Sequence, residues 1–304
     1  MRTPVRTGVV RLGLIAPLVA LVPAVASADD KQDFSKVQIK ATKVAGQIYV
    51  IDDATPEFSG GNIGVSVGPD GLALIDDKFA PLAPKVEAAL KTISDKPVRF
   101  IINTHFHGDH TDGNAVFGPK STVIAHANTR KRMAAGGKDD PPAPPAALPV
   151  ITFEDKLSVH LNGEEIRAIH FPNGHTDTDV VIFFTKSNVV HMGDDFFNGM
   201  FPFIDTENGG SVKGLITNLQ KLLEQIPADA KIIPGHGPIA TTKELRAYLT
   251  MLKETSGIVA AGIKAKKTAD QLKKDKVLAK HDAWAQGFIK ADEFIDALYK
   301  DLKR

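Results

Sequence analysis

Three histidines and one aspartate, His105, His107, Asp109 and His110, stand within six consecutive positions. The run before them, 98–103, is apolar and typical of a buried strand, so these residues are predicted to lie on a loop at its end. Core packing gives no reason for several ionisable side chains there. Imidazole and carboxylate are the ligands that zinc and similar ions bind when no thiolate is offered, and the sequence contains no cysteine. The segment therefore predicts a metal site with nitrogen and oxygen ligands.

Three further turns each place a ligand-type residue directly after a strand-like run. They read Asn173-Gly174-His175-Thr176, Met192-Gly193-Asp194-Asp195 and Pro234-Gly235-His236-Gly237. With the first segment they give seven candidate ligands: His105, His107, Asp109, His110, His175, Asp194 and His236. In a purely structural zinc site, four protein ligands fill all coordination positions of the ion, whereas a catalytic site leaves one position free for water or substrate. Seven ligands for two ions leave positions open, which favours an enzyme over a protein that only binds metal.

The elements that would hold these turns follow from the apolar pattern. Strands are expected at 47–52, 63–67, 72–75, 98–103, 123–125, 157–161, 166–171, 180–185, 189–192 and 231–233. Helices are expected at 82–93 and 211–223, and Thr241 with Glu244 has the spacing of a helix capping box. The order of strands, helix, strand and loop occurs twice. This order predicts one αββα domain of the α/β class.

The two ends of the chain differ from this middle part. Residues 1–28 combine three arginines, an apolar run and a final Ala-Ser-Ala, which is typical of a secretory signal peptide with its cleavage site. Residues 29–255 are then expected to form the catalytic domain, in which the segment 136–149, rich in Pro, Ala and Gly, is an exposed loop. Residues 256–304 are rich in Lys and helical in pattern, and are interpreted as a helical cap on that domain.

Charge and hydropathy limit the partners of the chain. Removal of residues 1–28 would leave 34 basic and 36 acidic residues, a formal charge near −2, so no nucleic-acid partner is expected. The alternative to a signal peptide is an uncleaved membrane anchor, but the apolar run 12–25 is shorter than the roughly 20 residues that span a bilayer and small residues close it. We therefore expect cleavage, which would remove this run and leave no membrane anchor. We therefore expect a periplasmic or secreted protein whose partner is a small-molecule substrate.

The four turns, in this order, resemble the metallo-β-lactamase superfamily. Its H-x-H-x-D-H loop and its G-H-T, G-D and G-H-G turns all match over roughly residues 40 to 245. The resemblance implies a four-layer αββα sandwich, here with a C-terminal helical extension. It also implies two zinc ions per chain, with iron or manganese as alternatives. One ion would be bound by His105, His107 and His175, the second by Asp109, His110 and His236, and Asp194 would bridge the two.

The implied chemistry is hydrolysis. Two divalent ions that share a carboxylate would hold a bridging water largely as hydroxide at neutral pH. This metal-bound hydroxide would attack a carbonyl carbon, and Asp109 would orient it by hydrogen bonding as the catalytic residue. Two divalent ions, two carboxylates and one hydroxide leave a charge of about +1, which favours an electron-rich carbonyl or a nearby anionic group on the substrate.

The substrate is the least determined part, because one fold hosts several chemistries. The absence of cysteine excludes the β-lactamase subclasses that use cysteine as a ligand, and Asp194 in that place resembles glyoxalase II-like thioesterases and lactonases. Export favours a substrate met outside the cytosol, so a class B β-lactamase-like hydrolase of a cyclic amide or ester is predicted. A glyoxalase II-like thioesterase or lactonase is the alternative. A persulfide dioxygenase-like redox enzyme is the alternative of another class.

A few further residues have two interpretations each. Phe58 stands among turn formers at 56–61, where it would either cover apolar substrate surface or fold into the core. His126 and His170 end strands, and are interpreted as structural residues or as partners of metal ligands. Asp195, beside the bridging candidate, is either a partner of the ligands or a structural acid.

Overall fold

The computed structural model describes Met1 and residues 33–54, 58–137 and 141–304. Within these residues, strands rich in apolar side chains form two β-sheets. The first sheet has seven strands, and they are neighbours in the order in which they occur along the chain. Their bounds are β1 (Ile39–Ala45), β2 (Ile48–Asp53), β3 (Ile63–Gly68), β4 (Gly71–Ile75), β5 (Val98–Ile102), β6 (Thr122–His126) and β7 (Ile151–Phe153). Strands β1 to β4 pair antiparallel, whereas β4 to β7 pair parallel. The proposed signal peptide, apart from Met1, lies outside the described residues.

The second sheet has five strands in the order β12-β11-β10-β9-β8. Their bounds are β8 (Lys156–Leu161), β9 (Glu164–His170), β10 (Val180–Phe184), β11 (Val189–His191) and β12 (Lys231–Ile233). The β8–β9 hairpin turns at Asn162 and Gly163, whose φ angles of 57° and 67° suit the two-residue turn that matches the twist of paired strands. Strand β12 pairs parallel to β11, because helix α5 (Val212–Gln225) connects them.

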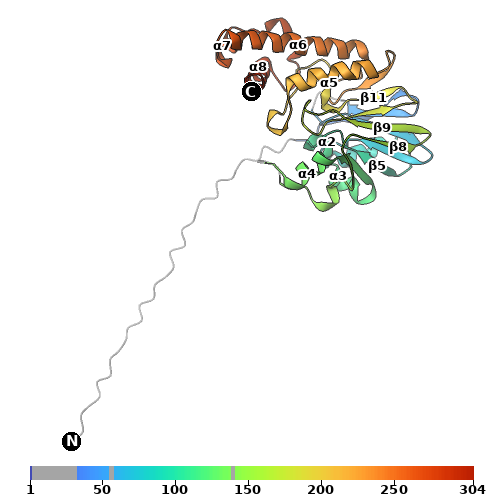
Figure 1. Ribbon diagram of the computed structural model, residues 1–304. Helices are drawn as coiled ribbons and strands as arrows, with labels where there is room; N and C mark the ends of the chain where they lie inside the picture. The colour runs from blue at the N-terminus through green and yellow to red at the C-terminus, as the bar shows by residue number, and fades with distance from the viewer. Residues whose placement is uncertain (2–32, 55–57, 138–140) are drawn as a thin grey trace. The chain divides into compact units, whose positions relative to one another are not determined.

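The two sheets pack face to face, and each covers its outer face with helices. Ile75 of β4 and Ile182 of β10 belong to the core between the sheets. Their neighbours along the chain point the other way, so that Leu74 packs toward α1 (Ala83–Lys91) and Val181 packs toward α5. Figure 1 shows α2 (Gly108–Thr111), α3 (Asn114–Phe117) and α4 (Ala127–Ala135) on the side of the sandwich opposite α5. The predicted four-layer αββα sandwich is confirmed.

The C-terminal helices share the core of the second sheet. Helices α6 (Thr242–Lys264), α7 (Ala269–Lys274) and α8 (Ala291–Leu302) lie with α5 on that side (Figure 1). Phe294 of α8 is fully buried, and its ring stacks on that of Phe201 with centroids 4.5 Å apart. The predicted capping box forms, with Thr241 as the cap of α6. The predicted division after residue 255 stays a prediction, and α6 runs without a break across that position while Phe34–Arg304 forms one compact unit.

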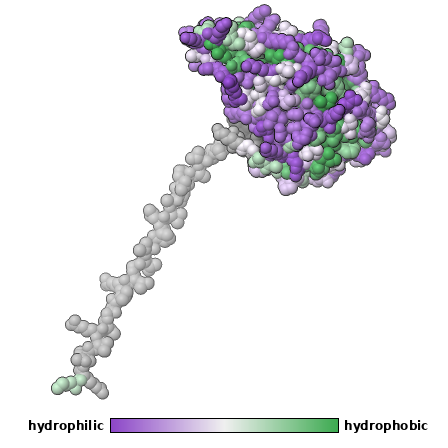
Figure 2. Space-filling view, in the orientation of Figure 1, coloured by the Kyte–Doolittle hydropathy of each residue, from purple (hydrophilic) through white to green (hydrophobic). Residues whose placement is uncertain are grey.

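The surface of this unit is mixed. Figure 2 shows that hydrophilic side chains predominate on the face that it draws, with apolar side chains in smaller groups. Within the described residues, none of the helices is both long enough and apolar enough to cross a membrane.

The shared core generates a prediction about stability. Replacement of buried Phe294 by Ala should lower the free energy of unfolding by about 3–5 kcal/mol, because it removes a large ring and leaves a cavity. Since α8 and the second sheet share one core, thermal unfolding followed by circular dichroism should remain a single transition at a lower temperature. The control Val150→Ala, at a 71% exposed position, should change the free energy by less than about 0.5 kcal/mol. A separate early transition of the C-terminal helices would contradict the shared core.

Candidate metal centre

The predicted ligands all follow the carboxyl ends of strands and meet at one end of the sandwich. His105 and His107 lie between β5 and α2, and His107 is the N-cap of α2. Asp109 and His110 lie in the single turn of α2 itself. The other three come from the second sheet: His175 follows β9, Asp194 lies in the 3-10 turn η4 (Gly193–Asp195) after β11, and His236 follows β12.

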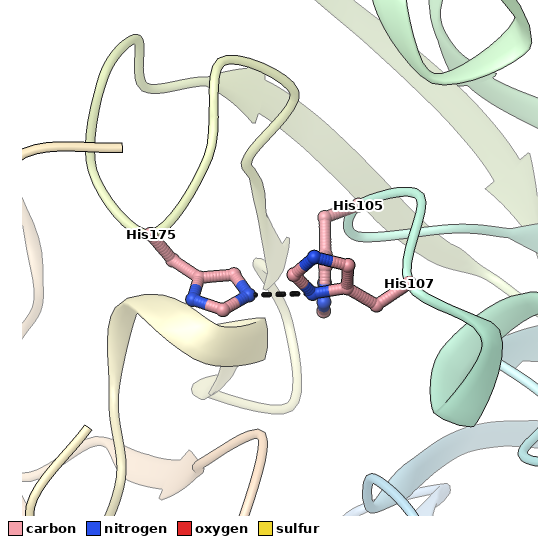
Figure 3. Close-up of side chains that lie close together, drawn as sticks. All are labelled: His105, His107 and His175. Carbon is pink, nitrogen blue, oxygen red and sulfur yellow. Dashed lines mark hydrogen bonds between the residues drawn. The ribbon is translucent and has the colours of Figure 1, made fainter. Parts of the chain in front are cut away.

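One group of three consists of His105, His107 and His175, and one ligand atom of each lies within 4.8 Å of the others. Figure 3 shows the three rings converging, with a dashed line from His175 to His107. His175 Nε2 lies 2.9 Å from His107 Nδ1, and the ring planes are nearly perpendicular, at 79°. This is the set that the resemblance assigned to the first metal ion.

A second group consists of Asp109, His110 and His236. The Nε2 atoms of His110 and His236 are 3.4 Å apart. Asp109 Oδ2 lies 3.3 Å from His236 Nε2 and 3.5 Å from His110 Nε2. This is the set that the resemblance assigned to the second ion.

Asp194 lies between the two groups. One of its oxygens, Oδ1, is 3.1 Å from His110 Nε2, while Oδ2 is 3.5 Å from His236 Nε2. On the other side, Oδ2 is 3.5 Å from His175 Nε2 and 3.8 Å from His105 Nε2. Asp194 thus faces imidazoles of both groups, and the resemblance assigned it the role of a bridging ligand.

The outer nitrogens of the first group are held by hydrogen bonds. His107 Nε2 donates to Asp205 Oδ2 at 3.0 Å, and His175 Nδ1 donates to the carbonyl oxygen of Phe203 at 2.9 Å. When both rings are neutral, these bonds fix the protons on the outer nitrogens, so lone pairs face each other across the 2.9 Å between the inner nitrogens. Two lone pairs repel at this distance unless a proton or a metal ion lies between them.

Asp76 fixes the remaining rings of the first segment. Its Oδ2 accepts a hydrogen bond from His110 Nδ1 at 2.8 Å and one from Thr104 Oγ1 at 2.7 Å, while its Oδ1 accepts from the Thr104 amide at 2.7 Å. Because the Thr104 hydroxyl donates to Asp76, its oxygen accepts from His105 Nδ1 at 3.0 Å. The inner Nε2 atoms of His105 and His110 are thereby presented to the centre of the cluster.

The cluster fits metal ions by an observation independent of the motif. His105 Nε2 and Asp194 Oδ1 are buried and make no hydrogen bond. A buried polar atom without a partner costs about 1–3 kcal/mol, and native proteins contain few such atoms. Both atoms point into the cluster, where a coordinated cation would satisfy them. With all five imidazoles in the neutral form that binds metal, the imidazoles and the two carboxylates would together carry a charge of −2, which suits divalent cations.

The ionisation of these groups follows from burial and from the two carboxylates. Burial lowers the pKa of His105 well below its ordinary value and that of His175 to about 4, so both imidazoles are neutral, the form that binds metal. Burial also acts to lower the pKa of His236, but Asp194 and Asp109 outweigh it and raise this pKa to about 9. The carboxylates therefore attract positive charge to their side of the cluster.

Glycine makes room for the ligands at two positions. A Cβ at Gly235 would lie 2.0 Å from Asp194 Oδ1, and a Cβ at Gly61 would lie 2.0 Å from the ring of His110. Both distances are far below van der Waals contact. The backbone of these turns thus packs directly against the ligands and holds them from outside.

The segment 58–61 is anchored beside the cluster by a buried lysine. Lys78 is fully buried, and its Nζ donates to Ser59 Oγ at 2.7 Å and to the carbonyl oxygen of Gly61 at 2.8 Å. Burial lowers the pKa of Lys78 to about 8, against the opposing effect of Asp53. Phe58, which this segment carries, is 37% exposed and stacks on the ring of His236 with centroids 5.6 Å apart. It belongs to none of the three hydrophobic cores of the described residues, and its role in substrate binding stays a prediction.

Four further residues, all of them histidine or aspartate, lie away from the centre of the cluster. His126 and His170 stack on each other with centroids 3.8 Å apart, and His191 bonds to the Asn62 carbonyl oxygen at 3.0 Å. Asp195 is buried behind Asp194 and faces Asp179, and burial raises its pKa to about 7.

Sequence reasoning did not find Asp76 or Asp205. Asp76 follows β4 directly, just as the predicted ligands follow their strands, and this position was the available signal. Asp205 lies on a long irregular segment after Asp194, where no pattern in the sequence indicates a contact with His107.

Comparisons with known proteins agree with this architecture. Residues 58–238, more than half of the chain, match the family model of the metallo-beta-lactamase superfamily. The solved structure of a metallo-beta-lactamase from Pontibacter korlensis superposes with a TM-score of 0.60 at 19% identity, covering 71% of this chain and 99% of that one. The chain therefore belongs to the metallo-β-lactamase superfamily.

The chain matches only part of each curated relative, and these relatives differ from one another in activity. A linear primary-alkylsulfatase from a Pseudomonas species is 24% identical over 61% of this chain and 43% of its own length. A hydroxyacylglutathione hydrolase from Nitrosococcus oceani is 30% identical over 45% of this chain and 47% of its own length. A metallo-beta-lactamase type 2 from Bacteroides fragilis is 26% identical over 49% and 56%. The chain thus spans about half the length of the curated relatives that it matches.

The hydrogen bonds of Asp76 generate a prediction about metal affinity. Asp76→Asn keeps the size of the side chain but turns one acceptor into an NH₂ group that faces donors. Loss of the fixed His110 orientation should weaken binding of one metal ion by a factor of ~10–100. Competition with a chromophoric chelator measures this affinity, and Asp95→Asn, at an exposed acid, is the control. Unchanged affinity for every bound ion would show that Asp76 does not orient a ligand.

The position of Asp194 generates a second prediction. Asp194→Asn removes the charge that faces both groups, so metal content should fall to about one ion per chain and kcat should fall by a factor of ~100 or more, since neighbouring ligands are misplaced as well. Asp195→Asn, the matched neighbour, should be milder because its carboxylate lies behind the cluster. Metal analysis and kcat are measured on the same samples. An Asp195 variant that loses metal while Asp194→Asn keeps two ions would reverse the assignment.

Proposed function

We propose that this protein is an exported binuclear metallo-hydrolase that acts on the carbonyl group of a cyclic amide or ester. The proposal of two metal ions rests on the pair of three-residue groups on either side of Asp194. In this proposal His105, His107 and His175 would hold one ion, Asp109, His110 and His236 would hold the other, and Asp194 would be a ligand of both. Zinc is the expected metal, with iron or manganese as alternatives.

Metal ions bound here would act as Lewis acids that polarise the carbonyl group and make water a stronger nucleophile. The contribution of the chain is to fix the ligands before substrate arrives. Asp76 and Asp205 orient the imidazoles, and Gly61 and Gly235 pack against the ligands so that they cannot turn away.

Asp109 is proposed as the catalytic residue. Its side chain is 18% exposed, against 5% for Asp194, so it is the carboxylate of the cluster that faces the substrate side. Asp109 accepts a hydrogen bond from the attacking water and so orients its oxygen toward the carbonyl carbon. The C–N or C–O bond then breaks, and the proton that the water loses passes to the leaving nitrogen or oxygen. Because the amide or ester is cyclic, the ring opens, and a single product carries both the carboxylic acid and the amine or hydroxyl group.

Two relatives bear on the choice of substrate. The likeness to the metallo-beta-lactamase type 2 supports a cyclic amide, in agreement with an exported enzyme. The likeness to the hydroxyacylglutathione hydrolase supports a second candidate, a thioesterase. In this candidate Asp194 resembles the ligand that glyoxalase II-like thioesterases have at this position. Both reactions use the same cluster, so only the group that leaves the carbonyl carbon distinguishes them.

The test uses the protein from residue 29 to residue 304, reconstituted with zinc and analysed for metal. We expect about two ions per chain, and hydrolysis that is lost with a chelator and restored by zinc, fastest with a β-lactam or a lactone. A hydroxyacyl thioester and a linear alkyl sulfate complete the substrate panel. A metal content that never exceeds one ion would exclude the binuclear site. Oxygen consumption with a persulfide, only in the iron-loaded protein, would replace hydrolysis by redox chemistry.

A further inference from the structure

The phenylalanines most exposed to solvent gather at the metal centre. Within the described residues, three phenylalanines are more than a third exposed: Phe58 at 37%, Phe203 at 41% and Phe288 at 45%. Each ring contacts a histidine of the cluster, since Phe58 and Phe288 lie against His236, and Phe203 against His175. Exposed apolar rings that collect around a polar site are typical of ligand pockets, which combine apolar walls with a few polar groups.

Phe288 stands out because it comes from the C-terminal segment, outside the part that matches the family model. It lies in the connection between the 3-10 turn η6 (Ala279–Trp284) and α8, far along the chain from every ligand. Its ring centroid is 5.5 Å from that of His236 and 5.6 Å from that of Phe58. The last part of the chain thus reaches back to the metal centre.

The connection that carries Phe288 is held firmly in place. Lys290 Nζ donates to the carbonyl oxygens of Gly287 at 2.7 Å and Ala285 at 3.1 Å, which closes the connection on itself. A Cβ at Gly287 would lie 2.7 Å from Met200 Sδ, so the backbone packs tightly on the segment after Asp194. An exposed ring on a fixed backbone loses little entropy when it binds a ligand.

The rings around His236 form an apolar wall. Phe58 and Phe197 both stack on the imidazole of His236, with ring centroids 5.6 and 5.1 Å away and interplanar angles of 24° and 20°. Phe288 approaches the same imidazole edge-on, at 76°, and is 6.0 Å from Phe197. Phe197 is fully buried, so Phe58 and Phe288 are the members of the wall that a ligand can cover.

We propose that Phe288 and Phe58 form an apolar subsite beside His236 that binds an alkyl or aryl group attached to the substrate. The proposal rests on the proposed function and deepens it, since it makes the substrate a hydrolysable compound with a sizeable apolar substituent. It assigns to the C-terminal segment a direct role in specificity. Phe288 is a substrate-contacting residue and takes no part in binding metal.

The first test measures binding and needs no turnover. On zinc-loaded protein, calorimetry compares 3-phenylpropane-1-thiol with propane-1-thiol, which share the metal-binding thiol and differ only in the phenyl ring. The wild-type protein should bind the phenyl compound at least about tenfold more tightly. Phe288→Ala should reduce this preference by about tenfold, and Phe288→Leu, which keeps an apolar side chain, should restore part of it. Equal affinity of the wild-type protein for the two thiols, or binding of neither, overturns the proposal.

Two controls separate the subsite from general packing. Phe288→Ala should keep the melting temperature within about 2 °C, because the ring is half exposed. Ile151→Ala, at a 40% exposed apolar position on β7, should leave the preference for the phenyl thiol unchanged. A double-mutant cycle with Phe58→Ala should give coupled rather than additive losses, since the two rings would contact the same group. A large loss of stability in Phe288→Ala, with the preference unchanged, assigns the ring to packing and overturns the proposal.

The kinetic test uses the substrate on which the zinc enzyme is active, with a methyl or a phenyl substituent. In Phe288→Ala, the ratio of kcat/KM for the phenyl compound to that for the methyl compound should fall about tenfold, mainly through KM. Failure of every β-lactam and lactone would reject the proposed reaction but not the subsite, because the thiol comparison is independent of it. An unchanged ratio in an active enzyme would reject the subsite and leave the reaction in place.

Discussion

The carboxylate of Asp194 is the constraint on which the rest of the site depends. It is buried, and four imidazole nitrogens from both groups lie within 4 Å of it. A buried negative charge is costly unless cations or donors surround it, so the fold must bring the histidines to this point and keep them there. The hydrogen bonds of Asp76 and Asp205 and the glycine turns at Gly61 and Gly235 serve this requirement.

The sandwich meets the requirement with short loops on rigid strands. Every ligand follows the carboxyl end of a strand by a few residues, so its position is set by the sheet and only its orientation by the loop. Because four ligands come from the first sheet and three from the second, the packing of the sheets determines the geometry of the cluster. The core between the sheets, with Ile75 and Ile182, is therefore as important to the site as the loops themselves.

Much of this could be predicted from sequence, because buried strands leave a strong apolar pattern. Strand β12 was expected at 231–233 and is found at Lys231–Ile233, and β5 and β10 differ from expectation by one residue at their ends. Strand β1 was largely missed, since Lys40 and Lys43 interrupt its alternation at the exposed edge of the sheet. Helix α4 was missed because it buries only Thr129 and Met133 and so lacks an apolar stripe.

The site, like the fold, could be predicted from the sequence only in part. The ligand positions are visible in sequence because each is a local turn motif, and the structure brings all seven together. Contacts between distant segments leave no local signal, so the pairing of Asp205 with His107 and the approach of Phe288 to His236 appear only in the folded chain. Asp76 is intermediate, since its place after a strand is visible but its three hydrogen bonds are not.

The distribution of the ligands over the two sheets has a consequence for folding. His110 and His236 are 126 residues apart in sequence, and their nitrogens are 3.4 Å apart in space. A cation shared by such residues acts as a cross-link between the halves of the sandwich, and it binds the folded chain far better than the unfolded one. Resistance to proteolysis would then depend on the concentration of free metal around the protein. The same chain would be long-lived where metal is plentiful and short-lived where it is scarce.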